Sequence, residues 1–238
     1  MIRWSKKTDF LSIRYPFILF CIYLLIVQFL KKPFITTGQQ IGENAYLADT
    51  NIYFWMQFIV YIFVCTITSF YFEENFRKNA AQYIDVFKIS TYKAVFLRYL
   101  RLILLLETVY IPFVVLSILK VNDSLTYHME YFNTTYVLID IAKPVFQCFA
   151  AMIFYITVSL FFTAVFRSRI YTMILLLTYA VIEATVFPRI LGKYALFYGS
   201  FGHPVDLYSF FPVNVTEMIF LSAVMLAASL ILHRFNKT

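Results

Sequence analysis

The stretch FEENFRKNAAQYIDVFKIS, residues 72–90, gathers three acids and three bases in an otherwise very apolar chain. Glu73 and Glu74 are adjacent, and Arg77 follows three residues after the second glutamate. Paired carboxylates can activate a water molecule as a general base, and a nearby cation can stabilise the anion that forms. These residue types therefore raise one chemical hypothesis first: hydrolysis at the membrane.

The remaining candidate groups disfavour that hydrolysis. Intramembrane proteases built on paired glutamates need an arginine four residues after the second glutamate, and Arg77 comes one residue too early. Their chemistry also needs histidines on other spans. His128 and His203 fall in predicted outer loops and His233 in the C-terminal tail, so none can meet Glu73 across a bilayer. The charges are then interpreted as the solvated start of a helix with acids in its first turn.

The composition is that of an integral membrane protein. Of the 238 residues, 61% are hydrophobic and only 14% are charged, whereas soluble domains average about 45–50% apolar and about 25% charged residues. The mean hydropathy is +0.74. The three cysteines are odd in number, lie in apolar runs and form no C-x-x-C pair, which disfavours a disulfide framework or a zinc site.

Six segments approach the roughly 20 apolar residues that a membrane-spanning helix needs. They are residues 15–31, 53–72, 100–119, 143–165, 170–187 and 216–232. The sequence therefore predicts an all-α polytopic membrane protein, with residues 1–238 forming a single transmembrane domain.

The distribution of lysine and arginine predicts the orientation. With both termini in the cytoplasm, 14 of the 20 Lys and Arg residues lie on the inner side, as positive charge is distributed in most membrane proteins. The net charge of +7 then needs no nucleic-acid partner, because anionic lipid at the inner surface can balance it.

The largest predicted cytoplasmic segment, residues 73–99, contains no glycine or proline and is expected to be helical. Phe76, Ala80, Tyr83, Ile84 and Phe87 recur at three- and four-residue intervals, which places them on one face of an amphipathic helix. A second helical piece is predicted from residue 90, where a Ser-Thr pair suits the N-cap, and it runs into the third span.

This layout resembles the membrane subunit of a type-two ABC exporter, the small six-helix permeases of bacterial efflux systems. The residues that carry the resemblance are an amphipathic start at 1–14, a second span that ends in Phe70-Tyr71-Phe72-Glu73-Glu74, and then Tyr83 to Lys88 followed by Ser90-Thr91-Tyr92-Lys93, Arg98 and Arg101. The chain departs from the family at Asn79-Ala80, where members often carry a Gly-Thr pair and a proline.

The resemblance implies a transport subunit rather than an enzyme. Residues 1–14 would be an interfacial helix, 73–99 a coupling segment, and 188–212 a re-entrant outer segment. A separate ABC ATP-binding subunit would hold ATP and Mg²⁺, since this chain has no Gly-rich Lys-Ser/Thr phosphate loop and no cofactor is expected in it. A second permease, identical or different, would complete the unit. The residues implied in ATPase coupling are Glu74, Arg77, Tyr83, Ile84, Phe87 and Lys88.

Two acids inside predicted spans are candidates for a transport path, because charge within the bilayer is costly and usually faces the bundle interior or a wet cavity. Glu107 lies two turns into the third span and Glu183 near the outer part of the fifth. Either acid could instead form a structural pair with another helix. The resemblance implies export of an amphipathic peptide, such as a bacteriocin, or of an amphiphilic drug from a bacterial cell. A non-transporting immunity or sensory protein and a membrane-embedded enzyme remain as alternatives.

Overall fold

The computed structural model describes residues 2–29, 40–41, 45–46, 50–76, 91–132, 135, 138–185 and 213–235. Within this part of the chain the structure is almost entirely helical. Its helices are α1 (Ile2–Phe29), α2 (Thr50–Phe76), α4 (Thr91–Phe132), α5 (Ala142–Phe166), α6 (Arg169–Thr185) and α9 (Val213–Phe235). Each of them overlaps one of the predicted spans.

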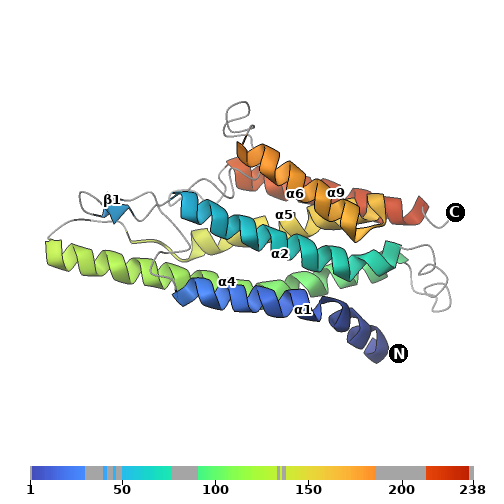
Figure 1. The fold of residues 1–238 in the computed structure, drawn as a ribbon, viewed down its shortest axis with the longest axis horizontal. Helices are drawn as coiled ribbons and strands as arrows, with labels where there is room; N and C mark the ends of the chain where they lie inside the picture. The colour runs from blue at the N-terminus through green and yellow to red at the C-terminus, as the bar shows by residue number, and fades with distance from the viewer. Residues whose placement is uncertain are drawn as a thin grey trace.

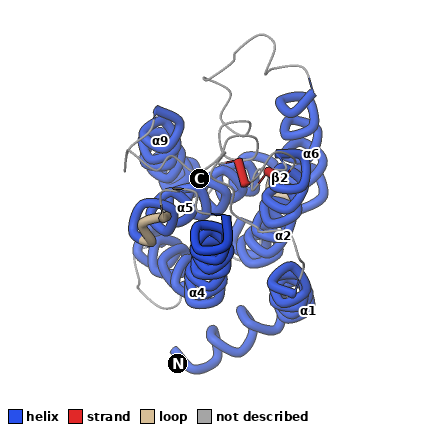
Figure 2. The backbone as a smooth tube through the Cα atoms, turned by 90° about the vertical axis from the view of Figure 1, so that its left-hand side faces the viewer, coloured by secondary structure: helices blue, strands red, loops and turns tan. Residues whose placement is uncertain are grey.

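The helices run side by side along one long axis (Figure 1). The view along that axis shows α5 inside the bundle, with α2, α4, α6 and α9 around it and α1 outside (Figure 2). The packing agrees, because α5 contacts those four helices while α1 packs against α2 and α4. The start of α1 and the end of α9 lie at the same end of the bundle as the end of α2 (Figure 1).

The central position of α5 follows from its sequence. Residues 154–160 are buried without interruption, and a helix that is apolar all round has no face to offer to water. Its two small hydroxyl residues in this stretch are satisfied by neighbours. Thr157 donates to the Ile153 carbonyl at 2.7 Å and Ser159 donates to the Cys65 carbonyl of α2 at 3.0 Å.

Three helices in the described residues are long and apolar enough to cross a membrane. They are Lys93–Tyr131, Ala142–Phe166 and Val215–Leu232. Shorter apolar stretches, Ile13–Phe29, Gln57–Glu73 and Arg169–Ile182, occupy α1, α2 and α6. A polytopic membrane protein is therefore consistent with the structure, while six complete spans remain a prediction.

The outer helices carry the exposed apolar side chains. Leu25 on α1, Leu104 on α4, Ile174 on α6 and Phe220 on α9 all lie on the bundle surface. Soluble proteins seldom expose so many large apolar residues together, and such a surface suits lipid. Among the described side chains of α2, in contrast, no large apolar group is exposed. The described part of α2 therefore packs its apolar side chains against other helices.

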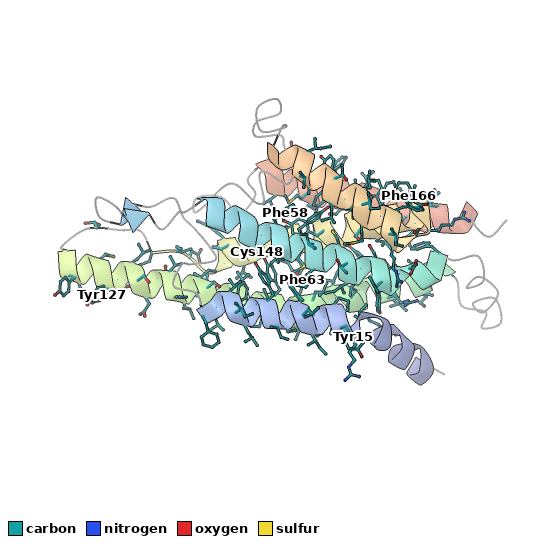
Figure 3. All side chains as sticks on the ribbon, in the orientation of Figure 1. Tyr15, Phe58, Phe63, Tyr127, Cys148 and Phe166 are labelled. Carbon is teal, nitrogen blue, oxygen red and sulfur yellow. The ribbon has the colours of Figure 1, made fainter. Side chains whose placement is uncertain are left out.

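Two helices differ from their predicted bounds. The interfacial helix 1–14 and the span 15–31 form one helix, α1, with Pro16 inside it. Its first turns diverge from the rest near Tyr15 (Figures 1 and 3), as expected where proline removes a backbone hydrogen bond. The third span is also longer than predicted, because α4 continues past residue 119 to Phe132.

The full length of α4 is 42 residues, or about 63 Å at a rise of about 1.5 Å per residue. Its last turns project beyond the other helices, where Tyr127 is labelled (Figure 3). The following chain is fastened to it by Asn122, whose amide donates to the Ile139 carbonyl at 2.9 Å and accepts from the Ile139 N–H at 2.8 Å. A short antiparallel hairpin, β1 (Gln40–Ile41) with β2 (Ala45–Tyr46), lies toward the same end (Figure 1). The sequence did not predict it.

Candidate functional site

The end of α2 is joined to the start of α6 by a buried acid. Glu73 is 8% exposed. Its Oε2 lies 3.6 Å from Nε of Arg169, and its Oε1 accepts the Arg169 backbone N–H at 3.4 Å. Arg169 is the first residue of α6, so the carboxylate meets both a guanidinium and the positive end of a helix dipole. The interpretation of Glu73 as a solvated acid in a first helical turn is therefore wrong, because α2 continues to Phe76 and buries it.

A tight turn brings Arg169 to this position. α5 ends at Phe166, and its C-cap residue Arg167 adopts a left-handed conformation with φ of 53° and donates its N–H to the Thr163 carbonyl at 2.9 Å. A single left-handed residue of this kind commonly ends a helix. Only Ser168 then separates the turn from α6, which leaves the first N–H groups of α6 facing α2.

A second arginine holds α2 from the other side. Arg98 of α4 donates through Nη2 to the Tyr71 carbonyl at 3.0 Å. Its guanidinium carbon lies 4.8 Å from the centre of the Tyr71 ring, within the range of a cation–π contact. Arg169 makes a similar contact with Phe70, at 4.3 Å. We call the group Phe70, Tyr71, Glu73, Arg98 and Arg169 the helix-end junction.

The helix-end junction lies beside the predicted coupling segment. Residues 73–76 of that segment belong to α2 and residues 91–99 to α4, while 77–90 fall outside the described residues. Among the predicted coupling residues, Glu74 therefore lies in α2 with its side chain outside the description. Arg77, Tyr83, Ile84, Phe87 and Lys88 lie wholly outside it. The re-entrant segment 188–212 is also outside the described residues.

A second polar group lies deeper in the bundle. Glu107 of α4 is only 5% exposed, and in the described part of the chain neither of its carboxylate oxygens has a hydrogen-bond partner. The Tyr110 hydroxyl, one turn further along α4, donates to Oε1 of Gln57 on α2 at 3.4 Å. Cys148 of α5, which is also buried, lies at the same level of the bundle. We call Gln57, Glu107, Tyr110 and Cys148 the buried polar cluster.

The registers of the helices place the cluster at one level. α4 and α5 are antiparallel, since Tyr99 bonds Thr157 at 2.7 Å while Asn122, further along α4, bonds Ile139 just before α5. α2 and α5 are parallel, since the ring of Tyr61 lies 5.2 Å from that of Tyr155 and Ser69 bonds Ser159 at 3.0 Å. Gln57 lies one turn before Tyr61 on α2. It therefore lies one turn before Tyr155 along α5, at the level that Glu107 also faces. Cys148 and Phe58 are labelled in this interior region (Figure 3).

Of the two acids predicted for a transport path, the structure places Glu107 in this cluster. Glu183 lies near the C-terminal end of α6, and its side chain is outside the description. Sequence reasoning missed Gln57, Tyr110, Cys148 and the partner of Glu73. The only available signal was weak: Gln57 is a lone amide in an apolar run.

No group of three or more His, Cys, Asp and Glu side chains that could hold a metal ion occurs among the described residues. Comparison of the chain with protein-family models, with curated proteins and with solved structures gives no match.

Proposed function

We propose that this chain is the permease subunit of an ATP-driven bacterial exporter, powered by a separate ABC ATP-binding subunit. The observation that carries the proposal is the helix-end junction. It fastens α2, α4 and α6 to one another beside the predicted coupling segment. A segment that receives force from an ATPase needs such rigid attachment to the spans that it moves.

The proposed coupling mechanism uses these contacts. Tyr83, Ile84 and Phe87 would supply the apolar contact with the ATP-binding subunit, and Glu74, Arg77 and Lys88 would set its register. The two ends of the segment are continuous with α2 and α4. Because Arg98 ties these helices together and Glu73 ties α2 to α6, displacement of the segment would move three helices at once.

The bundle geometry supports the proposed topology. The start of α1, the end of α2 and the end of α9 lie at one end (Figure 1). The helix-end junction, with its two arginines, belongs to this end and fits the cytoplasmic side under the positive-inside rule. Both termini would then be cytoplasmic, in a multi-pass protein of the bacterial cell membrane with anionic lipid around the inner ends.

The proposed cargo is an amphiphile, either an amphipathic peptide of the bacteriocin type or a drug-like compound. The outer helices offer apolar surface to a lipid-borne substrate, and Glu107 supplies a buried carboxyl group with no hydrogen-bond partner among the described residues. A second permease subunit would complete the pathway.

The test is co-purification of the solubilised chain with the ATP-binding subunits of its own cell, in the presence of Mg-ATP. The test variant changes Tyr83, Ile84 and Phe87 to alanine. The matched control changes Tyr127 and Tyr131 to alanine, exposed aromatic residues at the opposite end of α4.

We expect an ATP-binding subunit to be recovered with the native chain and the control, and to be lost with the test variant, because apolar anchors dominate such interfaces. Recovery of no ATP-binding subunit, under conditions that keep other exporters intact, would contradict the proposal and favour an immunity or sensory protein. Equal recovery with the test variant would place the contact elsewhere.

A further inference from the structure

We propose that the buried polar cluster binds the cationic group of the exported amphiphile, with Glu107 as its counter-ion. This inference rests on the proposed export function and specifies its substrate class: an organic monocation, such as an amine or quaternary ammonium, on an apolar body.

The first argument is the buried carboxyl group of Glu107, which has no hydrogen-bond partner among the described residues. Hydroxyl groups elsewhere on α4 are satisfied locally, as when Ser117 donates to the Phe113 carbonyl at 2.9 Å. Neither carboxyl oxygen of Glu107 has such a hydrogen-bond partner among the described residues, although both oxygens are buried. Burying an acid without a donor or a cation is costly. We expect a glutamate with only a structural role to have a charged partner, as Glu73 has in Arg169.

The second argument is the chemistry of the surroundings. Tyr110 stacks with Phe113 at 6.2 Å between ring centres, and Tyr61 meets Tyr155 edge to face. Aromatic faces attract organic cations and also pack against apolar bodies. The amide of Gln57 and the hydroxyl of Tyr110 are neutral, so Glu107 provides the negative charge of the cluster.

The third argument excludes a divalent metal as the occupant. Hard divalent cations take six or more oxygen ligands, usually with several carboxylates. The described residues supply one carboxylate at this level and no cluster of metal-ligating side chains. A single carboxylate in an aromatic environment matches a single positive charge that is weakly hydrated.

The position of the buried polar cluster on α4 connects cation binding to the proposed ATP-binding subunit. Arg98 and Glu107 lie on the same helix, nine residues apart, which is about 14 Å at about 1.5 Å per residue. Arg98 belongs to the helix-end junction, so a displacement delivered there would move the part of α4 that carries Glu107. Binding and release of the cation would follow that displacement.

The experiment measures binding of radiolabelled tetraphenylphosphonium to the purified full chain in nanodiscs of neutral phosphatidylcholine. Tetraphenylborate, an anion of the same shape, tests the role of charge. Glu107→Gln removes the charge while keeping the shape, and Glu107→Asp keeps the charge. Glu130→Gln is the matched control, because Glu130 is exposed at the far end of the same helix. Size-exclusion profiles and circular dichroism report whether each variant is folded.

We expect saturable binding of the cation to the native chain, unchanged with Glu130→Gln, weakened by about tenfold or more with Glu107→Gln, and partly restored with Glu107→Asp. The anion should not compete. Tyr110→Phe should weaken binding only a few-fold, since it removes a neutral group.

Absence of saturable binding to the native chain would overturn the inference, as would equal affinity with folded Glu107→Gln or competition by the anion. These results are separate from co-purification with an ATPase. A chain that recovers its ATP-binding subunit but binds no cation refutes this inference alone, whereas one that binds the cation but recovers no ATPase refutes the export function.

Discussion

Two buried glutamates in this chain have opposite surroundings. Glu73 at the end of α2 meets the Arg169 guanidinium and a backbone N–H. Glu107 in the middle of α4 meets no donor or cation in the described part of the chain. Their exposures are nearly the same, at 8% and 5%. Burial alone therefore does not distinguish the two acids, whereas the partners of each carboxyl group do.

The difference predicts opposite effects on stability. Removing an acid that is paired leaves its partners unsatisfied, which destabilises the fold. Removing an acid that is already unpaired relieves the cost of burying a polar group without a partner. The two residues can therefore be compared directly by the sign of the change in unfolding free energy.

The largest effect is expected for Glu73→Ala. It removes the charge partner of Arg169 and an acceptor for the first N–H of α6, and should lower the free energy of unfolding by about 2 kcal/mol. The estimate stays moderate because the Arg169 side chain is 42% exposed and can be hydrated. Unfolding by SDS in mixed micelles, followed by circular dichroism, measures the change.

Two matched variants make this result specific. Arg169→Ala should cost less than Glu73→Ala, because residue 169 keeps its backbone N–H and the hydrogen bond to Glu73. Glu130→Ala, at an exposed acid, should have almost no effect. Equal losses for Glu73→Ala and Glu130→Ala would mean that Glu73 is not a structural acid, and the contrast with Glu107 would disappear.

The next effect has the opposite sign. Glu107→Leu should raise the free energy of unfolding by about 1 kcal/mol, because an apolar side chain of similar size replaces an uncompensated acid in an apolar interior. The same unfolding assay applies. A loss of stability as large as that of Glu73→Ala would show that a residue outside the described part of the chain pairs with Glu107.

A smaller loss is expected for Arg98→Lys. The charge is retained, but the planar contact with the Tyr71 ring is lost, which should cost about 1 kcal/mol. If Arg98 also transmits force, ATP hydrolysis by the reconstituted complex should continue while its stimulation by substrate falls. Unchanged stimulation together with lowered stability would limit Arg98 to a structural role.

The sequence was sufficient to predict the helices because membrane helices are specified by apolar runs of sufficient length. The sequence predicted the ends of the helices less well. α4 continues past residue 119 through LKVNDSLTYHMEYF, where polarity suggested a loop although no glycine or proline interrupts the helix. The joining of the interfacial helix and first span at Pro16 was also missed, since proline bends a helix as readily as it ends one.

The candidate site was predictable only in part, for a physical reason. Glu107 could be identified from the sequence alone, because an acidic residue within an apolar run is unusual whichever residues surround it in the fold. The partner of Glu73 could not, since Arg169 lies 96 residues away and meets it only after the Arg167 turn orients α6. Gln57 and Tyr110 likewise could not be assigned to one site from the sequence, because only the parallel and antiparallel registers of the helices around α5 bring them together.

The smallest effect separates charge from ordinary hydrogen bonding along α4. Tyr99 lies between Arg98 and Glu107, and because Thr157 donates to the Ile153 carbonyl, Tyr99 must donate to Thr157. Tyr99→Phe removes this neutral bond and should cost about 0.6 kcal/mol, the average for such bonds between membrane helices. Tyr127→Phe, on the exposed end of α4, is the control. If Tyr99→Phe lowered the free energy of unfolding as much as Arg98→Lys, neutral contacts would hold α4 as firmly as charged ones. The helix-end junction would then not be the main attachment of α4. A loss below that of Arg98→Lys would leave the arginine as the stronger attachment of α4 to its neighbours.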